Sequence, residues 1–88
     1  MNTETENTLH VLLFSVLQDA VDGQKELEWP LDGDMTVGDL LGQLYARWPE
    51  LQKWDAQIRV GVDLEYVERN RPLRAGEEVA IMPPVQGG

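Results

Sequence analysis

The sequence contains no cysteine and only one histidine, His10. Without cysteine the chain can form no disulfide bond, offer no thiolate nucleophile and build no cysteine-ligated metal site. With one histidine and no cysteine, the usual zinc sites and catalytic triads are also unavailable. We therefore expect no bound cofactor and no bound metal, and we interpret His10 as a surface residue of a strand.

Basic residues are scarce as well. Seven Lys and Arg stand against sixteen Asp and Glu, which gives a formal net charge of −9. This charge repels phosphate backbones and anionic membranes, so we expect neither nucleic-acid nor membrane binding. The negative charge has two interpretations: it favours binding to a basic protein surface, or it only keeps the protein soluble.

No apolar run is long enough to span a membrane. The longest, Leu9 to Leu17, is interrupted by His10 and Ser15 and follows no basic leader. We expect a cytoplasmic protein with one domain, because 88 residues suffice for one small core. Residues 1–8 are predicted to be a flexible polar extension, residues 9–82 the domain and residues 83–88 an extended tail.

Two segments have the composition of paired strands. His10 to Val16 is rich in apolar and β-branched residues without helical spacing, which is typical of a buried strand. From Glu26 to Leu31, apolar and polar residues alternate as in a half-buried strand. The turn signal Asp22-Gly23 predicts an antiparallel hairpin, and Pro30 places its second strand at a sheet edge or ends it.

The clearest helix signal lies between Thr36 and Trp48. Thr36 is a capping residue, and Asp39 follows at the spacing of a capping box. Apolar side chains then recur at helical spacing, at Val37, Leu40, Leu41, Leu44, Tyr45 and Trp48. Pro49 ends the helix, because the residue before a proline avoids helical geometry.

Three further strands are predicted, over 58–62, at 66–67 and over 78–82, with a Pro72 to Gly76 turn before the last. Strands around a single helix predict one mixed sheet with the helix packed on one face, an α+β roll. We expect the first and last strands to pair at its centre.

The residues after the last strand carry the strongest functional signal. Pro83-Pro84 stops ladder pairing and favours an extended rod. Gly87 and Gly88 have no side chains, so they can thread a narrow channel and present the terminal carboxylate inside another protein. A frayed terminus also ends this way, but that interpretation leaves the stiff Pro-Pro spacer unexplained.

Several segments match a known pattern when taken together. They are Val11-Leu-Leu-Phe14, Thr36-Val37 followed by Leu40, Val60 to Val67, Leu73 to Ala80, and the ending Pro83-Pro-Val-Gln-Gly-Gly88. From Leu9 to Gly88 the chain resembles the small, sulfur-carrying subunit of molybdopterin synthase, one of the ubiquitin-like β-grasp sulfur carriers. The Pro-Pro-Val-x-Gly-Gly ending resembles the molybdopterin branch most closely.

This resemblance implies a β-grasp fold and a carrier cycle. A ubiquitin-activating-like adenylyltransferase would use ATP to adenylate the Gly88 carboxylate, and a sulfur donor would convert it to a thiocarboxylate. The large catalytic subunit of molybdopterin synthase would then receive the tail, and the sulfur would pass to cyclic pyranopterin monophosphate in molybdenum cofactor biosynthesis. The chain would be a sulfur-donating, non-catalytic subunit of that heteromeric enzyme.

The resemblance also indicates which residues contact partners: Phe14, Met82, Pro83, Pro84, Val85, Gln86 and Gly87. Because they should lie near the tail end of the sheet, Phe14, Leu64 and Met82 are candidates for an exposed apolar patch. Two positions depart from the family pattern: Asp63 stands where Asn is common, and Gln18-Asp19 stands where Arg-Glu is common. Both departures concern partner contacts rather than the chemistry of the tail.

Three alternatives remain open from the sequence. The chain could carry sulfur for another pathway, such as thiamine synthesis or thiolation, although the Pro-Pro-Val ending argues against the thiamine branch. It could be a ubiquitin-like modifier that forms isopeptide bonds through Gly88. It could also be an interaction module whose tail only docks.

Overall fold

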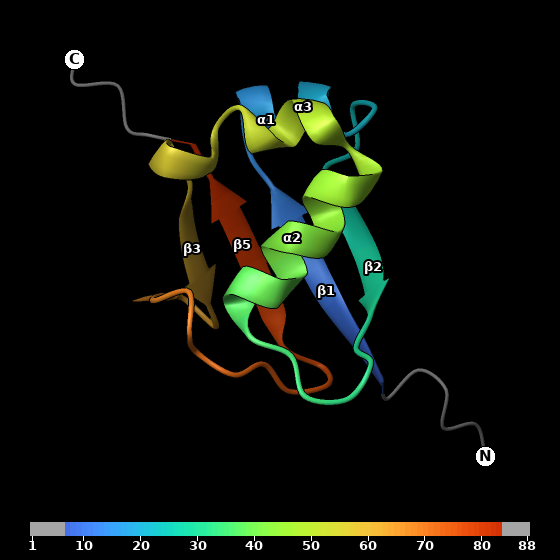
Figure 1. Cartoon of the computed structure of the whole chain (residues 1–88), viewed down its shortest axis with the longest axis vertical. Helices are drawn as coiled ribbons and strands as arrows, with labels where there is room; N and C mark the ends of the chain where they lie inside the picture. The colour runs from blue at the N-terminus through green and yellow to red at the C-terminus, as the bar shows by residue number, and fades with distance from the viewer. Residues whose placement is uncertain (1–6, 84–88) are drawn as a thin grey trace.

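The computed structural model describes residues 7–83, which form a five-stranded sheet with helices on one face (Figure 1). The elements in chain order are β1 (Thr8–Leu13), α1 (Val16–Ala20), β2 (Glu26–Pro30), α2 (Val37–Arg47), α3 (Pro49–Gln52), the 3-10 helix η2 (Asp55–Gln57), β3 (Arg59–Val62), β4 (Glu65–Val67) and β5 (Glu78–Met82). The predicted α+β class and mixed sheet are confirmed. Among the described residues, no helix is long and apolar enough to cross a membrane.

The strands lie in the order β2-β1-β5-β3-β4. β1 and β5 are parallel neighbours at the centre, with Leu13 opposite Ile81, while β1–β2, β3–β4 and β3–β5 are antiparallel. The expected central pairing of the first and last strands is therefore confirmed. Because the two central strands are parallel, their carboxyl ends meet at the same edge of the sheet.

The β1–β2 hairpin forms as predicted, with β2 at an edge. Pro30 is the last residue of β2. Because β2 is an edge strand that ends there, the missing amide hydrogen of proline does not interrupt the hydrogen bonds of the sheet. β1 begins at Thr8, one residue before the predicted domain start, because Thr8 is opposite Pro30 and the Asn7 carbonyl accepts a 2.8 Å hydrogen bond from the Leu31 amide. Strand β1 thus includes Thr8, which the sequence places in the polar extension.

The first strand is shorter at its other end than the sequence indicates. It ends at Leu13, not Val16, because Ser15 has a positive φ of 56° that breaks the extended backbone. The short helix α1 follows and buries Leu17 completely, while the Gln18 side-chain amide donates a 3.0 Å hydrogen bond to the Leu13 carbonyl. The prediction of a strand over residues 14–16 is wrong for this reason.

The helix α2 begins and ends where its capping signals place it. Thr36 Oγ1 accepts a 3.2 Å hydrogen bond from the Asp39 amide, and Asp39 Oδ2 accepts a 3.0 Å bond from the Thr36 amide. α2 ends at Arg47, with Trp48 as its C-cap and Pro49 opening α3. Figure 1 shows α2 lying across β1 and β5.

The core lies between α2 and one face of the sheet. Alternate residues of the strands point into it, and the buried set includes Leu9, Val11, Leu13, Leu40, Leu41, Leu44, Val60, Val62, Val79 and Ile81. Trp48 is buried as predicted, and its indole nitrogen donates a 3.1 Å hydrogen bond to Asp22. Trp29 packs against it with ring centroids 6.0 Å apart.

Candidate functional site

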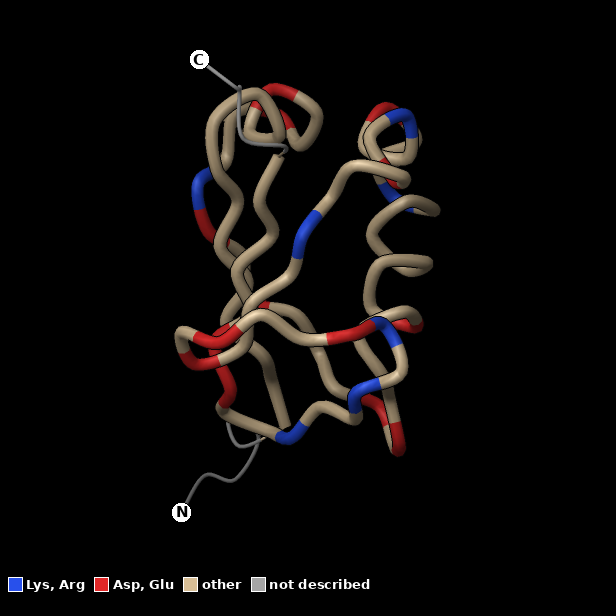
Figure 2. Tube along the Cα trace, turned by 90° about the vertical axis from the view of Figure 1, so that its left-hand side faces the viewer, with Lys and Arg blue, Asp and Glu red and all other residues tan. Residues whose placement is uncertain are grey.

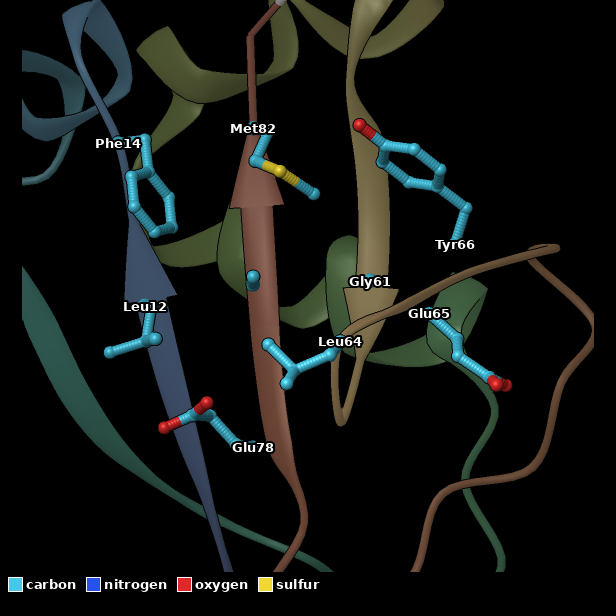
Figure 3. A pocket seen from close by; sticks show the side chains of 9 residues that line it. Leu12, Phe14, Gly61, Leu64, Glu65, Tyr66, Glu78 and Met82 are labelled. Atoms are coloured by element: carbon cyan, nitrogen blue, oxygen red, sulfur yellow. The ribbon is translucent and has the colours of Figure 1, made fainter.

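The face of the sheet opposite α2 carries an apolar groove. No element among residues 7–83 covers this groove, which has a volume of about 330 Å³. Its lining comes from β1, β5, β3 and the hairpin that leads into β4 (Figure 3), and consists of Leu12, Phe14, Gly61, Leu64, Tyr66, Ala80 and Met82, together with Glu65 and Glu78. Side chains far apart in the sequence therefore form one surface.

Three of these side chains are exposed although they are large and apolar. Phe14 exposes 43% of its surface, Tyr66 71% and Leu64 98%. Leu64 projects from the turn between β3 and β4 toward β5, and Phe14 stands at the other side of the groove (Figure 3). Exposed apolar side chains gathered in one place are typical of an interaction surface.

The groove runs along β5, from Glu78 at the start of the strand to Met82 at the end where the tail begins. The Phe14 amide donates a 3.3 Å hydrogen bond to the Ile81 carbonyl, which joins the end of β1 to the end of β5. Met82 lines the groove as the last residue of β5, and Pro83 follows it at once. A partner seated in the groove would consequently also contact the start of the tail.

Some of the predicted site residues lie in or next to the groove, and the others lie outside the described residues. Phe14 and Met82 lie together in the groove, Leu64 joins them, and Pro83 adjoins it. The remaining tail positions, Pro84, Val85, Gln86, Gly87 and Gly88, lie outside the described residues. Phe14, Leu64 and Met82 line the same groove, but the register of β3 and β5 sets Leu64 at the Glu78 end, away from the start of the tail. Their contact with a partner stays a prediction.

Six groove residues escape the sequence analysis: Leu12, Gly61, Glu65, Tyr66, Glu78 and Ala80. Leu12 lies in a strand that appears buried throughout, yet in β1 only alternate residues are buried, and Leu12 faces outward. Gly61 pairs with Ala80 on one side and Tyr66 on the other, so it lies on the groove floor. The weak alternation along β1 is the one signal that could have revealed Leu12.

The charge around the groove is negative. Its lining includes Glu65 and Glu78 but neither Lys nor Arg. Across the molecule, Asp and Glu positions occur at both ends, and at the lower end the basic positions lie among them (Figure 2). The acidic lining of the groove suits a partner with basic residues around its contact surface.

His10 lies next to this acidic edge, opposite Glu78 in the sheet register. Its Nε2 lies 2.7 Å from Glu26 Oε1, and its Nδ1 lies 3.2 Å from Glu28 Oε2. The hydrogen bond with Glu28, helped by the charge of Glu26, raises the pKa of His10 above its ordinary value. His10 therefore joins β1 to the edge strand as a surface contact.

Two further clusters of ionisable side chains are paired with each other. The Tyr45 hydroxyl donates a 2.6 Å hydrogen bond to Asp55, and Arg69 binds the same oxygen at 2.7 Å, so the pKa of Asp55 is lowered. Burial raises the pKa of Tyr45. Arg71 and Glu77 form a forked ion pair at 2.9 and 3.0 Å. The Asp55 cluster joins η2 and the loop after β4 to α2, and the Arg71–Glu77 pair closes the loop between β4 and β5.

Within the described residues, no group of three acidic or histidine side chains is placed to hold a metal ion. The groove itself offers apolar surface and two carboxylates, without a nucleophile beside a base. The arrangement can bind another protein at the edge where the tail leaves.

This sheet order and the single main helix define a ubiquitin-like β-grasp fold. The chain belongs to the ThiS family of sulfur carriers, whose family model matches residues 11–88. It is similar to the molybdopterin synthase sulfur carrier subunit of Mycobacterium tuberculosis, with 29% identity over 91% of this chain and 96% of the relative.

Two solved structures extend the comparison. The crystal structure of SAMP1 from Haloferax volcanii superposes with a TM-score of 0.78 at 31% identity, over 92% of this chain and 99% of that one. A protein-protein complex of subunits 1 and 2 of the molybdopterin-converting factor from Helicobacter pylori gives a TM-score of 0.67 at 17% identity, over 92% and 99%. The second likeness concerns the fold alone, and that structure is a complex of two subunits.

Proposed function

We propose that this chain is the sulfur carrier subunit of molybdopterin synthase. The observation that carries the proposal is that an apolar docking groove adjoins the start of a tail with the sequence Pro-Pro-Val-Gln-Gly-Gly. Docking and delivery would then occur at the same edge of the sheet. The relative from Mycobacterium tuberculosis supports the choice of pathway.

The chemistry would take place at the Gly88 carboxylate. One of its oxygens attacks the α-phosphate of ATP on an adenylyltransferase, so that pyrophosphate leaves and an acyl adenylate forms. Hydrosulfide from a sulfur donor then attacks the carbonyl carbon of the adenylate, so that a C–S bond forms, AMP leaves and a thiocarboxylate remains. This chain binds no cofactor in the cycle, because ATP is used by the activating enzyme.

The tail would enter the active site of the large subunit in extended form. Pro83 and Pro84 keep it from folding back, and Gly87 adds no side chain to a narrow channel. Val85 and Gln86 would contact the channel walls, while Phe14 and Met82 contact the partner's surface around its entrance. The sulfur would pass to cyclic pyranopterin monophosphate. We place this cycle in the cytoplasm.

The pathway is tested by supplying the thiocarboxylated chain, the large subunit from the same organism and cyclic pyranopterin monophosphate, and measuring molybdopterin. Formation of molybdopterin, dependent on the thiocarboxylate, is the expected result. A matched reaction with the unmodified carboxylate should give none. No molybdopterin from a fully thiocarboxylated chain would refute the pathway but leave sulfur carriage intact.

A ubiquitin-like modifier is the second candidate. The likeness to SAMP1, the small archaeal modifier protein 1 of Haloferax volcanii, favours it at 31% identity. In that role the Gly88 adenylate would be attacked by a lysine amine of another protein, with AMP leaving as an isopeptide bond forms. Mass spectrometry of cell proteins for lysines bearing the C-terminal residues of this chain separates the two roles.

A further inference from the structure

The turn between β3 and β4 holds Leu64 in a backbone conformation that suits it poorly. Asp63 has a φ of 50° and Leu64 a φ of 74°, whereas two-residue hairpin turns of this kind favour Asn and Gly. A leucine there brings its β carbon close to the backbone. Since Leu64 is 98% exposed, no packing in the described structure offsets this strain.

A second strained position lies at the other side of the same groove. Ser15, which directly follows Phe14, has a φ of 56° and a ψ of −132°, a combination that glycine adopts far more easily. The Leu17 amide donates a 3.1 Å hydrogen bond to the Phe14 carbonyl and closes a tight turn there. Strained backbone that persists in a fold tends to gather at functional sites.

We propose that Leu64 is held as a projecting anchor for a partner protein, and that the free carrier gives up folding stability to present it. Leu64 reaches over the Glu78 end of the groove, while Phe14 and Met82 line the end from which Pro83 leaves (Figure 3). The inference rests on the proposed function, because the partner in question is a protein that takes the tail. It adds to that function a specific contact residue, Leu64, whose strained backbone lowers the stability of the free carrier.

The surroundings of Leu64 define the chemistry of the partner. Asp63 precedes it, Glu65 follows it, and Glu78 lines the groove, while no Lys or Arg does. The matching surface is an apolar socket for Leu64 with Lys or Arg around its rim. Association should accordingly slow as salt is raised, because exposed charges steer the encounter.

Three variants of the full chain test the proposal. Leu64→Gly relieves the strain and removes the anchor, Leu64→Met keeps an apolar side chain, and Ser15→Gly relieves strain without changing a groove side chain. Each is unfolded with denaturant in the absence of partners. Each is then titrated, by calorimetry, into the activating enzyme and into the large subunit of molybdopterin synthase from the same organism.

We expect Leu64→Gly to raise the ratio of folded to unfolded protein about threefold, since relief of strain exceeds the added flexibility of glycine. The same variant should bind at least about tenfold more weakly, as expected for loss of an anchor residue. Leu64→Met should stay within about twofold of the original chain in affinity. Ser15→Gly should gain stability and keep its affinity.

The proposal is overturned if Leu64→Gly binds both partners as the original chain does, or if it is no more stable. It also falls if the original chain binds neither partner. If the original chain binds the activating enzyme but not the large subunit, and Leu64→Gly loses that binding, the anchor stands and the molybdopterin pathway fails. If the original chain makes molybdopterin and Leu64→Gly binds normally, the pathway stands and the anchor fails.

Discussion

The Met82 methyl carbon Cε lies 3.4 Å from the point that a β carbon on Gly61 would occupy. The Glu65 carbonyl oxygen is equally close, at 3.4 Å. A glycine at this position keeps the floor of the groove open and lets Met82 lie over it. The groove therefore depends on the absence of a side chain as much as on the apolar side chains around it.

Replacing Gly61 with valine should fill the floor and displace Met82. Because methionine is flexible, we expect the fold to survive with a loss of about 1 kcal/mol in the free energy of unfolding. Binding to the activating enzyme should weaken by about fivefold or more, measured as a rise in the KM for the carrier in ATP–pyrophosphate exchange.

The matched control for this change is Gly42→Val. Gly42 lies in α2, and a β carbon there would meet nothing within 4 Å. Its KM should stay near that of the original chain. An equal rise in KM for both variants would show that the groove floor has no special role.

Phe14 and Val16 provide a second matched pair. They expose 43% and 44% of their surfaces, yet Phe14 lines the groove and Val16 does not. Phe14→Ser should weaken partner binding about tenfold, while Val16→Ser should leave it within about twofold. Calorimetric titration into the activating enzyme measures both. Equal losses from the two variants would argue for a diffuse apolar surface instead.

The capping box of α2 gives a prediction about stability. Thr36→Ala should lower the free energy of unfolding by about 1 kcal/mol, because the Asp39 amide loses its acceptor at the helix terminus. Asp39→Ala should act similarly through the Thr36 amide. Since the two residues cap each other, the double variant should lose less than the sum in denaturant unfolding. If the two losses of stability simply added in the double variant, Thr36 and Asp39 would not depend on each other as a capping box requires.

How far the sequence predicts this structure depends on whether a signal is local. The helix α2 is predicted to within a residue because its cap, apolar stripe and terminating proline are all near in sequence. The end of β1 is not predicted correctly. The helix that follows it forms because Leu17 is buried in the core, which is a tertiary effect. Residues that looked like strand thus became a turn and a helix.

The candidate site follows the same rule. The tail's Pro-Pro and Gly-Gly steps can be recognised in sequence order, and with them the position where the domain ends. The groove cannot be recognised in this way. It forms only when β5 lies between β1 and β3, in the register that sets Gly61 opposite Ala80. Tyr66 and Leu12 become neighbours of Met82 only through that pairing.

His10 should titrate above its ordinary pKa of 6.5, because Glu28 and Glu26 stabilise the imidazolium. The stability from this contact is then fully present below pH 6.5 and is lost as the pH rises through the higher folded-state pKa. NMR titration of the imidazole measures it directly. Glu28→Gln should bring the pKa back toward 6.5 and should reduce stability at acidic pH only. A pKa at or below 6.5 in the original chain would contradict the contact.

The central claim is that Gly88 carries the sulfur, and intact mass spectrometry tests it most directly. The chain is incubated with its activating enzyme, ATP and a sulfur donor, beside a variant that lacks Gly88. We predict that the full chain gains the mass difference of one sulfur in place of one oxygen, located at its last residue, and that the shortened chain does not. An unchanged mass with an enzyme that adenylates the chain, or the same gain in the shortened chain, would contradict the account.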